Sequence, residues 1–256
     1  MGSDQVRARE RAYHDKLYGG FAQRHFAKPA VRALRAHMAA RILSLTRSNP
    51  RARVLSLGCG IGDTEILIAP RVGELVGIDI SPAAVRQARE DAERAGLGNA
   101  TFLEGSLEDL AFEPHSFDLV FAIFLLHHLP DGLLVATIRR TRELLAAGGH
   151  FYALDPSRHR LSGAVGRLLF PKLMRGYQSP DERELDRAQL ERWFLAEDFP
   201  CQIGYYDFVS SPLAGLLPAW RAGYLAARAA DDWLIRIPLV RRLGSNLEVI
   251  GTPAVR

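Results

Sequence analysis

Three glycines that follow a short apolar segment constrain the fold of this chain more than any other feature. Residues 53–57 (RVLSL) have the length and apolar character of a buried strand, and Gly58, Gly60 and Gly62 come directly after them. Glycine allows sharp backbone turns and lets a ligand approach without an intervening side chain. A glycine loop between a strand and a helix is typical of α/β proteins that bind a nucleotide.

The spacing of the glycines indicates which kind of nucleotide fits. The dinucleotide fingerprint is G-x-G-x-x-G, and this chain has Asp63 where that pattern needs its third glycine. A carboxylate at this place would repel a pyrophosphate at a helix N-terminus. The loop therefore favours a ligand that carries a cationic amino-acid tail.

Apolar strands alternate with helices around this loop. The pattern predicts helices at residues 29–46, 82–95 and 131–146 and strands at residues 53–57, 74–79, 100–103, 117–122 and 150–154. Strands that are apolar on both faces belong to a parallel sheet covered by helices on both sides. Ser81 and Pro82 are typical of the cap and first turn of a helix. This part of the chain predicts a doubly wound α/β fold.

The regular alternation of strands and helices ends after Pro156. A helix is predicted at residues 184–197 and strands at residues 201–209 and 245–252. Between these strands lies an apolar stripe that predicts one helix, made of Leu213, Leu216, Leu217, Trp220 and Tyr224. We expect one α/β domain with N-terminal helices and inserted cap helices.

Composition excludes several classes of protein. The net charge is only +4 and the arginines are spread along the chain, so no nucleic-acid-binding stripe is indicated. The longest apolar run, residues 119–126, is too short to span a membrane, and the N-terminus has no apolar signal core. Two cysteines, Cys59 and Cys201, form no disulfide framework. We expect a cytoplasmic protein.

Five blocks between residues 51 and 156 resemble the class I S-adenosylmethionine-dependent methyltransferases. They occur in the order and spacing of that family and read RVLSLGCGIG, GIDIS, FLEGSLEDL, FDLVFAIFLLHHLPD and LLAAGGHFYALDP. The resemblance implies a mostly parallel, seven-stranded Rossmann-like sheet and S-adenosyl-L-methionine as cofactor. It also implies three regions: an N-terminal helical segment over the cofactor site (1–48), the cofactor-binding core (49–156), and cap helices with C-terminal strands that complete the sheet (157–256).

The resemblance also implies the cofactor-binding residues. Asp79 would accept hydrogen bonds from two ribose hydroxyls, Ile80 would lie against the adenine, and Ala122 would face the methionine tail. The full implied set is Tyr18, Gly58, Cys59, Gly60, Gly62, Asp79, Ile80, Gly105, Ser106, Leu107, Ala122 and His127.

Several of these positions have an alternative interpretation. Asp79 is also placed to cap the following helix, and Cys59 has the character of a small buried residue. Tyr18 or Tyr13 would lie near the cofactor carboxylate if the N-terminal segment folds over the site, and in a frayed tail if it does not. The family often has an acidic residue where this chain has Ser56, and more often aspartate at the position of Ser106.

Three residues are candidates for catalysis. Transfer of a methyl group to a hydroxyl or a carbon acid requires a base, and His127, His128 and Asp155 follow the ends of predicted strands. Because the two histidines are adjacent, we expect one of them to face the site. The alternative is a structural role in a turn, and neither their spacing nor their neighbours indicate a metal site.

Elimination points to a small-molecule substrate. The chain has no N/D-P-P-Y type element after residues 117–122, which nucleic-acid amino methylation uses, and no paired glutamates of protein arginine methylation. We expect methyl transfer to an O, N or C nucleophile of a small, largely apolar metabolite, such as a polyketide, quinone, prenyl or lipid-like molecule. Cap aromatic and apolar residues would hold it or simply pack as core: Phe170, Leu173, Met174, Tyr177, Trp193, Phe194, Tyr205, Tyr206, Trp220 and Tyr224.

Two other functions stay open at this point. A member of the same fold can catalyse a reaction other than methylation. Residues 213–240 are apolar on one side and carry Arg221, Arg228 and Arg236, which is consistent with weak contact with a membrane surface. We expect a monomer or a homodimer with no nucleic-acid partner.

Overall fold

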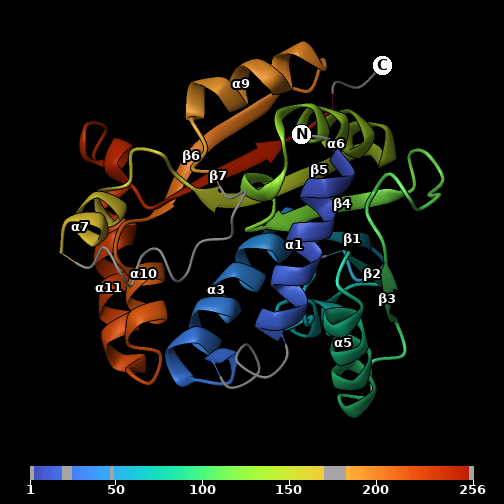
Figure 1. The fold of residues 1–256 in the computed structure, drawn as a ribbon, viewed down its shortest axis with the longest axis horizontal. Coiled ribbons are helices and arrows are strands. Elements are labelled where there is room, and N and C mark those ends of the chain that lie inside the picture. Colours follow the sequence, from blue (N-terminus) through green and yellow to red (C-terminus); the bar gives the residue numbers. More distant parts are fainter. Residues whose placement is uncertain (1–2, 19–24, 47–48, 170–182, 254–256) are drawn as a thin grey trace.

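The computed structural model describes residues 3–18, 25–46, 49–169 and 183–253. Seven strands form one sheet in the order β3-β2-β1-β4-β5-β7-β6 (Figure 1). The strands are β1 (Arg53–Leu57), β2 (Glu74–Asp79), β3 (Ala100–Glu104), β4 (Phe117–Ile123), β5 (Leu145–Pro156), β6 (Cys201–Asp207) and β7 (Asn246–Gly251). The predicted doubly wound, mostly parallel, seven-stranded fold is confirmed.

The order of the strands places a ligand site at β1 and β4. Strands β1 to β5 are parallel, and β7 is antiparallel to both β5 and β6. The chain winds outward from β1 to β3 in one direction and continues from β4 in the other. The connections diverge at this switch point, which leaves a crevice at the carboxyl ends of the two strands.

Helices cover both faces of the sheet. Figure 1 shows α6 and α9 on one side and α3, α5, α10 and α11 on the other, with α1 crossing in front of the strands. The longer helices are α1 (Ser3–Tyr18), α3 (Pro29–Leu45), α5 (Pro82–Arg94), α6 (Asp131–Leu144), α7 (Leu161–Leu169), α9 (Arg187–Ala196), α10 (Ser210–Leu216) and α11 (Arg221–Leu234). Short turns of helix are α4 (Glu65–Ile68), η1 (Ala69–Arg71), η2 (Leu126–His128) and η3 (Val240–Leu243).

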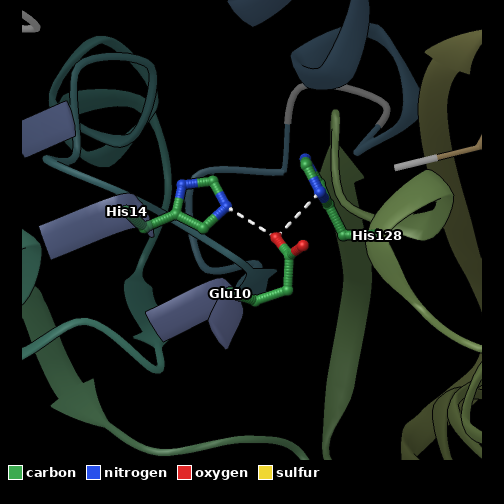
Figure 2. Close-up of side chains that lie close together, drawn as sticks. All are labelled: Glu10, His14 and His128. Carbon is green, nitrogen blue, oxygen red and sulfur yellow. Dashed lines mark ion pairs between the residues drawn. The ribbon is translucent and has the colours of Figure 1, made fainter. Parts of the chain in front are cut away.

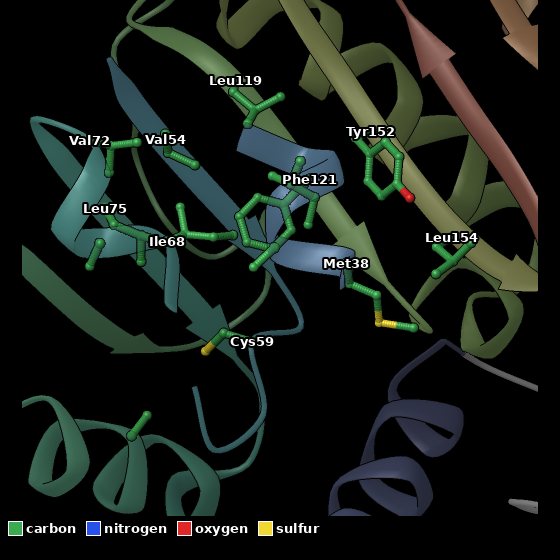
Figure 3. Packing of buried hydrophobic residues seen from close by; sticks show 14 of the residues in the cluster. Met38, Val54, Cys59, Ile68, Val72, Leu75, Leu119, Phe121, Tyr152 and Leu154 are labelled. Atoms are coloured by element: carbon green, nitrogen blue, oxygen red, sulfur yellow. The ribbon is translucent and has the colours of Figure 1, made fainter. Parts of the chain in front are cut away.

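Alternate residues of each central strand enter opposite cores, because side chains on a strand point alternately to its two faces. Phe121 and Tyr152 pack toward α3 and α11, with Met38 beneath them (Figure 3). Their neighbours Val120 and Phe151 pack toward α6 and α9. All four strand residues are almost fully buried, so the central strands form a rigid platform for the loops at their ends.

The structure corrects some predicted boundaries. The stripe from Leu213 to Tyr224 belongs to two helices, α10 and α11, because Pro218 lies between them and cannot donate the backbone hydrogen bond of a continuous helix. Tyr224 is buried and Trp220 is exposed. The predicted cap at Ser81 is confirmed, since its side chain accepts a hydrogen bond from the Ala84 amide at 3.1 Å.

Other boundaries move by a few residues. Strand β5 begins at Leu145, where the sequence predicted the end of a helix. Helix α9 begins at Arg187, because the Asp186 side chain accepts from the Gln189 amide and caps it. No helix within the described residues is long and apolar enough to cross a lipid bilayer.

Candidate active site

A cavity of about 510 Å³ lies at the crevice formed by the ends of the parallel strands. Most of the residues implied by the resemblance line this cavity. Those that line it are Tyr18, Gly58, Cys59, Gly60, Asp79, Ile80, Gly105, Ser106, Leu107, His127 and His128. The sequence therefore identified the wall of the cavity from short blocks that lie far apart along the chain.

The glycine loop forms one wall because its backbone is left-handed at three positions. The φ angles are +65° at Gly58, +54° at Gly60 and +74° at Gly62. A Cβ added at Gly60 would lie 2.7 Å from the Tyr18 hydroxyl, so a side chain there would close the approach to the cavity.

Gly62 and Ala122 do not line the cavity. A Cβ at Gly62 would lie 3.1 Å from the Ala88 Cβ, so this glycine lets the loop pack against α5. Ala122 is fully buried within the sheet, between Leu57 and Ala153 of the neighbouring strands. Gly62 and Ala122 therefore pack behind the residues that line the cavity.

Asp79 is held firmly at the end of β2. One carboxylate oxygen accepts a hydrogen bond from the Gly60 amide at 2.9 Å, and the other accepts from the Ser81 amide at 2.8 Å. Desolvation raises the pKa of Asp79 above its ordinary range, while these backbone hydrogen bonds oppose the rise. The helix cap that the sequence left open for Asp79 is supplied by Ser81 instead. Each carboxylate oxygen has a second lone pair for a ligand.

A buried carboxylate that the sequence analysis missed lies beside Ser56. The Ser56 hydroxyl donates to Glu65 Oε1 at 2.6 Å, and Glu65 lines the cavity with 3% of its surface exposed. Its Oε2 is buried and has no hydrogen-bond partner among the described residues. Burial raises the pKa of Glu65 to about 7. The acidic group expected at Ser56 is therefore present, but it comes from the turn of helix α4.

Asp63, which the loop analysis singled out, has an ion-pair partner. Its carboxylate lies 2.8 Å from Nε of Arg35, which reaches over from α3. The guanidinium also lies over the Phe26 ring, at 5.1 Å from its centroid. The charge of Asp63 is therefore already balanced by an ion pair, whereas Glu65 has no ion-pair partner among the described residues.

Helix α1 lies along the opening of the cavity. The Ser81 hydroxyl donates to Asp15 at 2.5 Å, and the exposed Arg11 pairs with Glu104 at the end of β3. Tyr13 and Tyr18 both line the cavity, and burial raises the pKa of the Tyr18 hydroxyl. Residues 3–18 are thus a helix against the site and not a frayed tail.

Cys59 is a small buried residue, as the sequence indicated. Its side chain is 5% exposed, and desolvation together with the nearby Asp79 raises the pKa of its thiol. A thiol with a raised pKa stays protonated and is a poor nucleophile.

The two adjacent histidines both border the cavity, so the prediction that only one of them faces it is wrong. They lie in η2, where successive side chains are about 120° apart, and a concave wall can receive both. His127 Nδ1 lies 2.8 Å from Asp155 Oδ1, and the His127 amide donates to the same oxygen at 3.1 Å. His128 Nδ1 lies 3.1 Å from Glu10 Oε2.

Asp155 stands behind His127 and does not line the cavity. It is 2% exposed, and burial raises the pKa of its carboxyl group to about 8. The carboxyl group fixes the orientation of the His127 ring, with Nδ1 turned toward Asp155. This arrangement can hold or transfer a proton at the cavity wall.

The predicted aromatic cap does not line the cavity. Phe170, Leu173, Met174 and Tyr177 lie outside the described residues. Phe194, Tyr206 and Tyr224 are buried in the two cores, and none of the described members of the set borders the cavity. Its apolar walls include Phe26, Val31, Leu34, Phe124, Leu125, Leu129 and Leu133.

Comparison with known proteins matches part of the chain to a described family. Residues 54–149 match the family described as "Methyltransferase domain". The uncharacterized methyltransferase YcgJ of Bacillus subtilis is 32% identical over 103 residues, which are 40% of each chain. Its crystal structure superposes on 86% of this chain and 99% of its own, with a TM-score of 0.60 and 22% identity. That likeness shows a shared fold.

Two further relatives have names that specify a substrate. Aklanonic acid methyltransferase DauC of Streptomyces sp. is 32% identical over 122 residues, 46% of this chain and 54% of that protein. Demethylmenaquinone methyltransferase of Listeria welshimeri is 30% identical over 124 residues, 47% of this chain and 52% of that protein. The matches thus span about half the length of these relatives or less.

Proposed function

We propose that this chain, whose residues 54–149 match the methyltransferase domain family, uses S-adenosylmethionine to methylate an O, N or C nucleophile of a small, largely apolar metabolite. The proposal rests on one observation: the same cavity is bordered by residues suited to binding a nucleoside and by a histidine suited to proton transfer. Gly60 and Asp79 border it at the strand ends, and the His127–Asp155 pair stands at another wall.

The residues present fit the cofactor. The left-handed loop at Gly58 and Gly60 lets a nucleoside approach the backbone. Asp79 has a lone pair on each oxygen for ribose hydroxyls, and Ile80 and Leu107 offer apolar surface to a base. The uncompensated carboxylate of Glu65 suits the amino group of the methionine tail. When bound, S-adenosylmethionine supplies an electrophilic methyl group on its sulfonium.

His127 is the proposed base. Its Nδ1 faces Asp155, which leaves Nε2 to take a proton from a substrate hydroxyl or carbon acid. Asp155 is ionised above the pKa of its carboxyl group, about 8; it then accepts a hydrogen bond from Nδ1, keeps the ring in this orientation and stabilises the charge that the ring gains. The protein otherwise contributes position and exclusion of water, since methyl transfer needs an in-line approach of the nucleophile.

The walls of the cavity favour an apolar substrate. Phe124, Leu125, Leu129 and Leu133 line the cavity together with the histidines, and Arg35, which also lines it, already pairs with Asp63. A flat, apolar molecule with one reactive hydroxyl or ring carbon suits such a wall. The relatives named for aklanonic acid and demethylmenaquinone agree with a polyketide or quinone-like substrate.

The experiment that tests this function has two parts. Calorimetric titration with S-adenosylhomocysteine, with NADH as competing ligand, should give micromolar binding of the first and none of the second. Incubation with S-adenosylmethionine and a panel of hydroxylated quinones and aromatic polyketides should then produce S-adenosylhomocysteine. Preference for NADH would contradict the cofactor. Cofactor binding without turnover on any substrate would favour the non-methylating alternative.

A second candidate is contact with a membrane surface. Several apolar side chains near the C-terminal helices are exposed, among them Trp220 at 55% and Trp233 at 64%. Exposed tryptophans beside arginines are typical of surfaces that bind the lipid interface. Flotation with anionic liposomes, compared for the wild type and Trp233→Ser, tests this candidate.

A further inference from the structure

Three potential metal ligands from distant segments meet at the cavity wall. Glu10 and His14 are one helical turn apart on α1, and His128 comes from η2 after strand β4. Figure 2 shows both imidazole rings turned toward one carboxylate oxygen of Glu10. All three residues line the cavity that holds Asp79 and His127.

The distances match those between ligands of one metal ion. Glu10 Oε2 lies 3.4 Å from His14 Nε2 and 3.1 Å from His128 Nδ1, and the three donor atoms lie within 4.8 Å of one another. Ligands that bind zinc tetrahedrally, with bonds of about 2.0 to 2.1 Å, lie about 3.3 Å apart. The carboxylate oxygen therefore already has nearly the separation from each imidazole nitrogen that coordination requires.

Burial makes a bound cation favourable. The side chain of Glu10 is 5% exposed, and those of His14 and His128 are 19% and 14% exposed. A buried carboxylate is costly unless positive charge compensates it.

The two imidazole rings do not block the space between them. The ring planes of His14 and His128 are 79° apart, with centroids at 5.1 Å, so the rings converge edge to face and do not stack over the gap.

We propose that Glu10, His14 and His128 bind a single divalent transition-metal ion at the substrate end of the cavity. Two imidazoles and one carboxylate suit zinc, iron(II) or cobalt(II), and not magnesium or calcium, which prefer oxygen ligands. Three protein ligands leave at least one coordination position open to water or to an oxygen of the substrate. The sequence analysis predicted no metal site, because nothing in the sequence places α1 beside His128.

The position of the site indicates what it would do. The His127 and His128 rings lie side by side, with centroids 4.0 Å apart, so an oxygen bound to the metal would be close to the proposed base. Two of the ligands belong to α1, so the ion would also hold this helix against the cavity. The role in orienting a substrate rests on the proposed function, whereas metal binding itself does not.

The test measures metal binding directly, without cofactor or substrate. The full chain is stripped with a chelator and titrated with Zn²⁺ by calorimetry, and with Co²⁺ by visible absorption. We expect one ion per chain with an affinity that Glu10→Gln, His14→Ala and His128→Ala each weaken by at least about 100-fold. His159→Ala is the matched control, because His159 forms an exposed pair with Asp186 at 3.3 Å, and it should leave binding unchanged.

X-ray absorption of the zinc-loaded wild type makes the test independent of how the variants fold. Two imidazole nitrogens and at least one oxygen at about 2.0 to 2.1 Å would support the site. Absence of stoichiometric binding, or binding that His14→Ala and His128→Ala leave unchanged, would overturn it. Failure here would leave S-adenosylhomocysteine binding intact, whereas failure of the proposed function would show as absent cofactor binding or absent turnover and leave the metal titration unchanged.

Discussion

The two ends of the cavity are built in different ways. At the end proposed for the cofactor, the glycine loop and Asp79 come directly after parallel strands, and backbone amides hold the carboxylate in place. At the other end, side chains join α1 to η2, as in the pair of Glu10 with His128, and α3 contributes Val31, Leu34 and Arg35 to the cavity wall. The first end depends on local sequence and the second on contacts between distant segments.

This difference suggests where the molecule can vary. An end held by backbone hydrogen bonds fixes one ligand, because few substitutions preserve its shape. An end assembled from side chains can change its ligand through single substitutions while the sheet stays the same. Variants that change one end of the cavity and leave the other intact test this view.

Asp79→Ala should have the largest effect, confined to the cofactor end. It removes the charged acceptor proposed for two ribose hydroxyls and frees the amides of Gly60 and Ser81. The loss is about 4 kcal/mol, or roughly 1,000-fold in the affinity for S-adenosylhomocysteine. Glu104→Ala at the end of neighbouring strand β3 is the control, since it loses only an exposed pair with Arg11. Equal affinities in the two variants would show that Asp79 does not hold the cofactor.

Glu65→Gln should change the dependence of stability on pH. Burial raises the pKa of Glu65 to about 7 in the folded chain, from an ordinary value of 4.5. The folded state therefore keeps a proton that the unfolded state loses, so this contribution to stability is full below pH 4.5 and is lost as pH rises through about 7. The difference between the two values corresponds to about 3 kcal/mol.

The measurement is urea unfolding at pH 5 and pH 8 without cofactor. Relative to the wild type, Glu65→Gln should be more stable at pH 8 than at pH 5, by up to about 3 kcal/mol. Saturating S-adenosylhomocysteine should reduce this difference, because its amino group would compensate the Glu65 carboxylate. Glu74→Gln is the control, with a half-exposed carboxylate beside Arg53. The same pH dependence in both variants would contradict the assignment.

The same division explains what the sequence predicts and what it does not. The seven strands, the cap at Ser81 and the cavity-lining positions of Gly58, Gly60 and Asp79 follow from short contiguous patterns, because each lies at or beside the end of a strand. Glu65 was missed because the turn of α4 brings it back to Ser56, nine residues earlier in the chain. The pattern of the loop does not show this turn.

Longer-range features were predictable in part. The position of α1 over the site was expected as one of two alternatives, but the meeting of Glu10 with His128 was not, since 118 residues separate them. Pro218 was visible in the sequence, yet the apolar stripe from Leu213 to Tyr224 suggested one continuous helix. The prediction followed the apolar periodicity, but in the structure Pro218 prevents one continuous helix.

Asp155→Asn should affect catalysis and leave the cofactor end unchanged. The neutral amide cannot stabilise a protonated ring, and its NH₂ group, when turned to His127 Nδ1, would place the ring proton on Nε2, which then cannot act as a base. We expect kcat to fall by about 100-fold for a hydroxyl or carbon substrate, with the same Kd for S-adenosylhomocysteine. Steady-state kinetics beside calorimetry separates the two quantities. An unchanged kcat would mean that the pair has only a structural role.

Asp15→Ala should have the smallest effect, and it tests the contact between the two ends. Asp15 accepts from the Ser81 hydroxyl, so its loss detaches α1 from the loop after β2 without removing the cap of α5, which Ser81 still provides. The expected loss is about 1 kcal/mol, or roughly fivefold faster release of S-adenosylhomocysteine. Hydrogen exchange of the α1 amides should accelerate in parallel. Arg11→Ala removes an exposed pair from the same helix and should change neither. If both variants behave like the wild type, α1 does not hold the ligand, and the two ends of the cavity act independently.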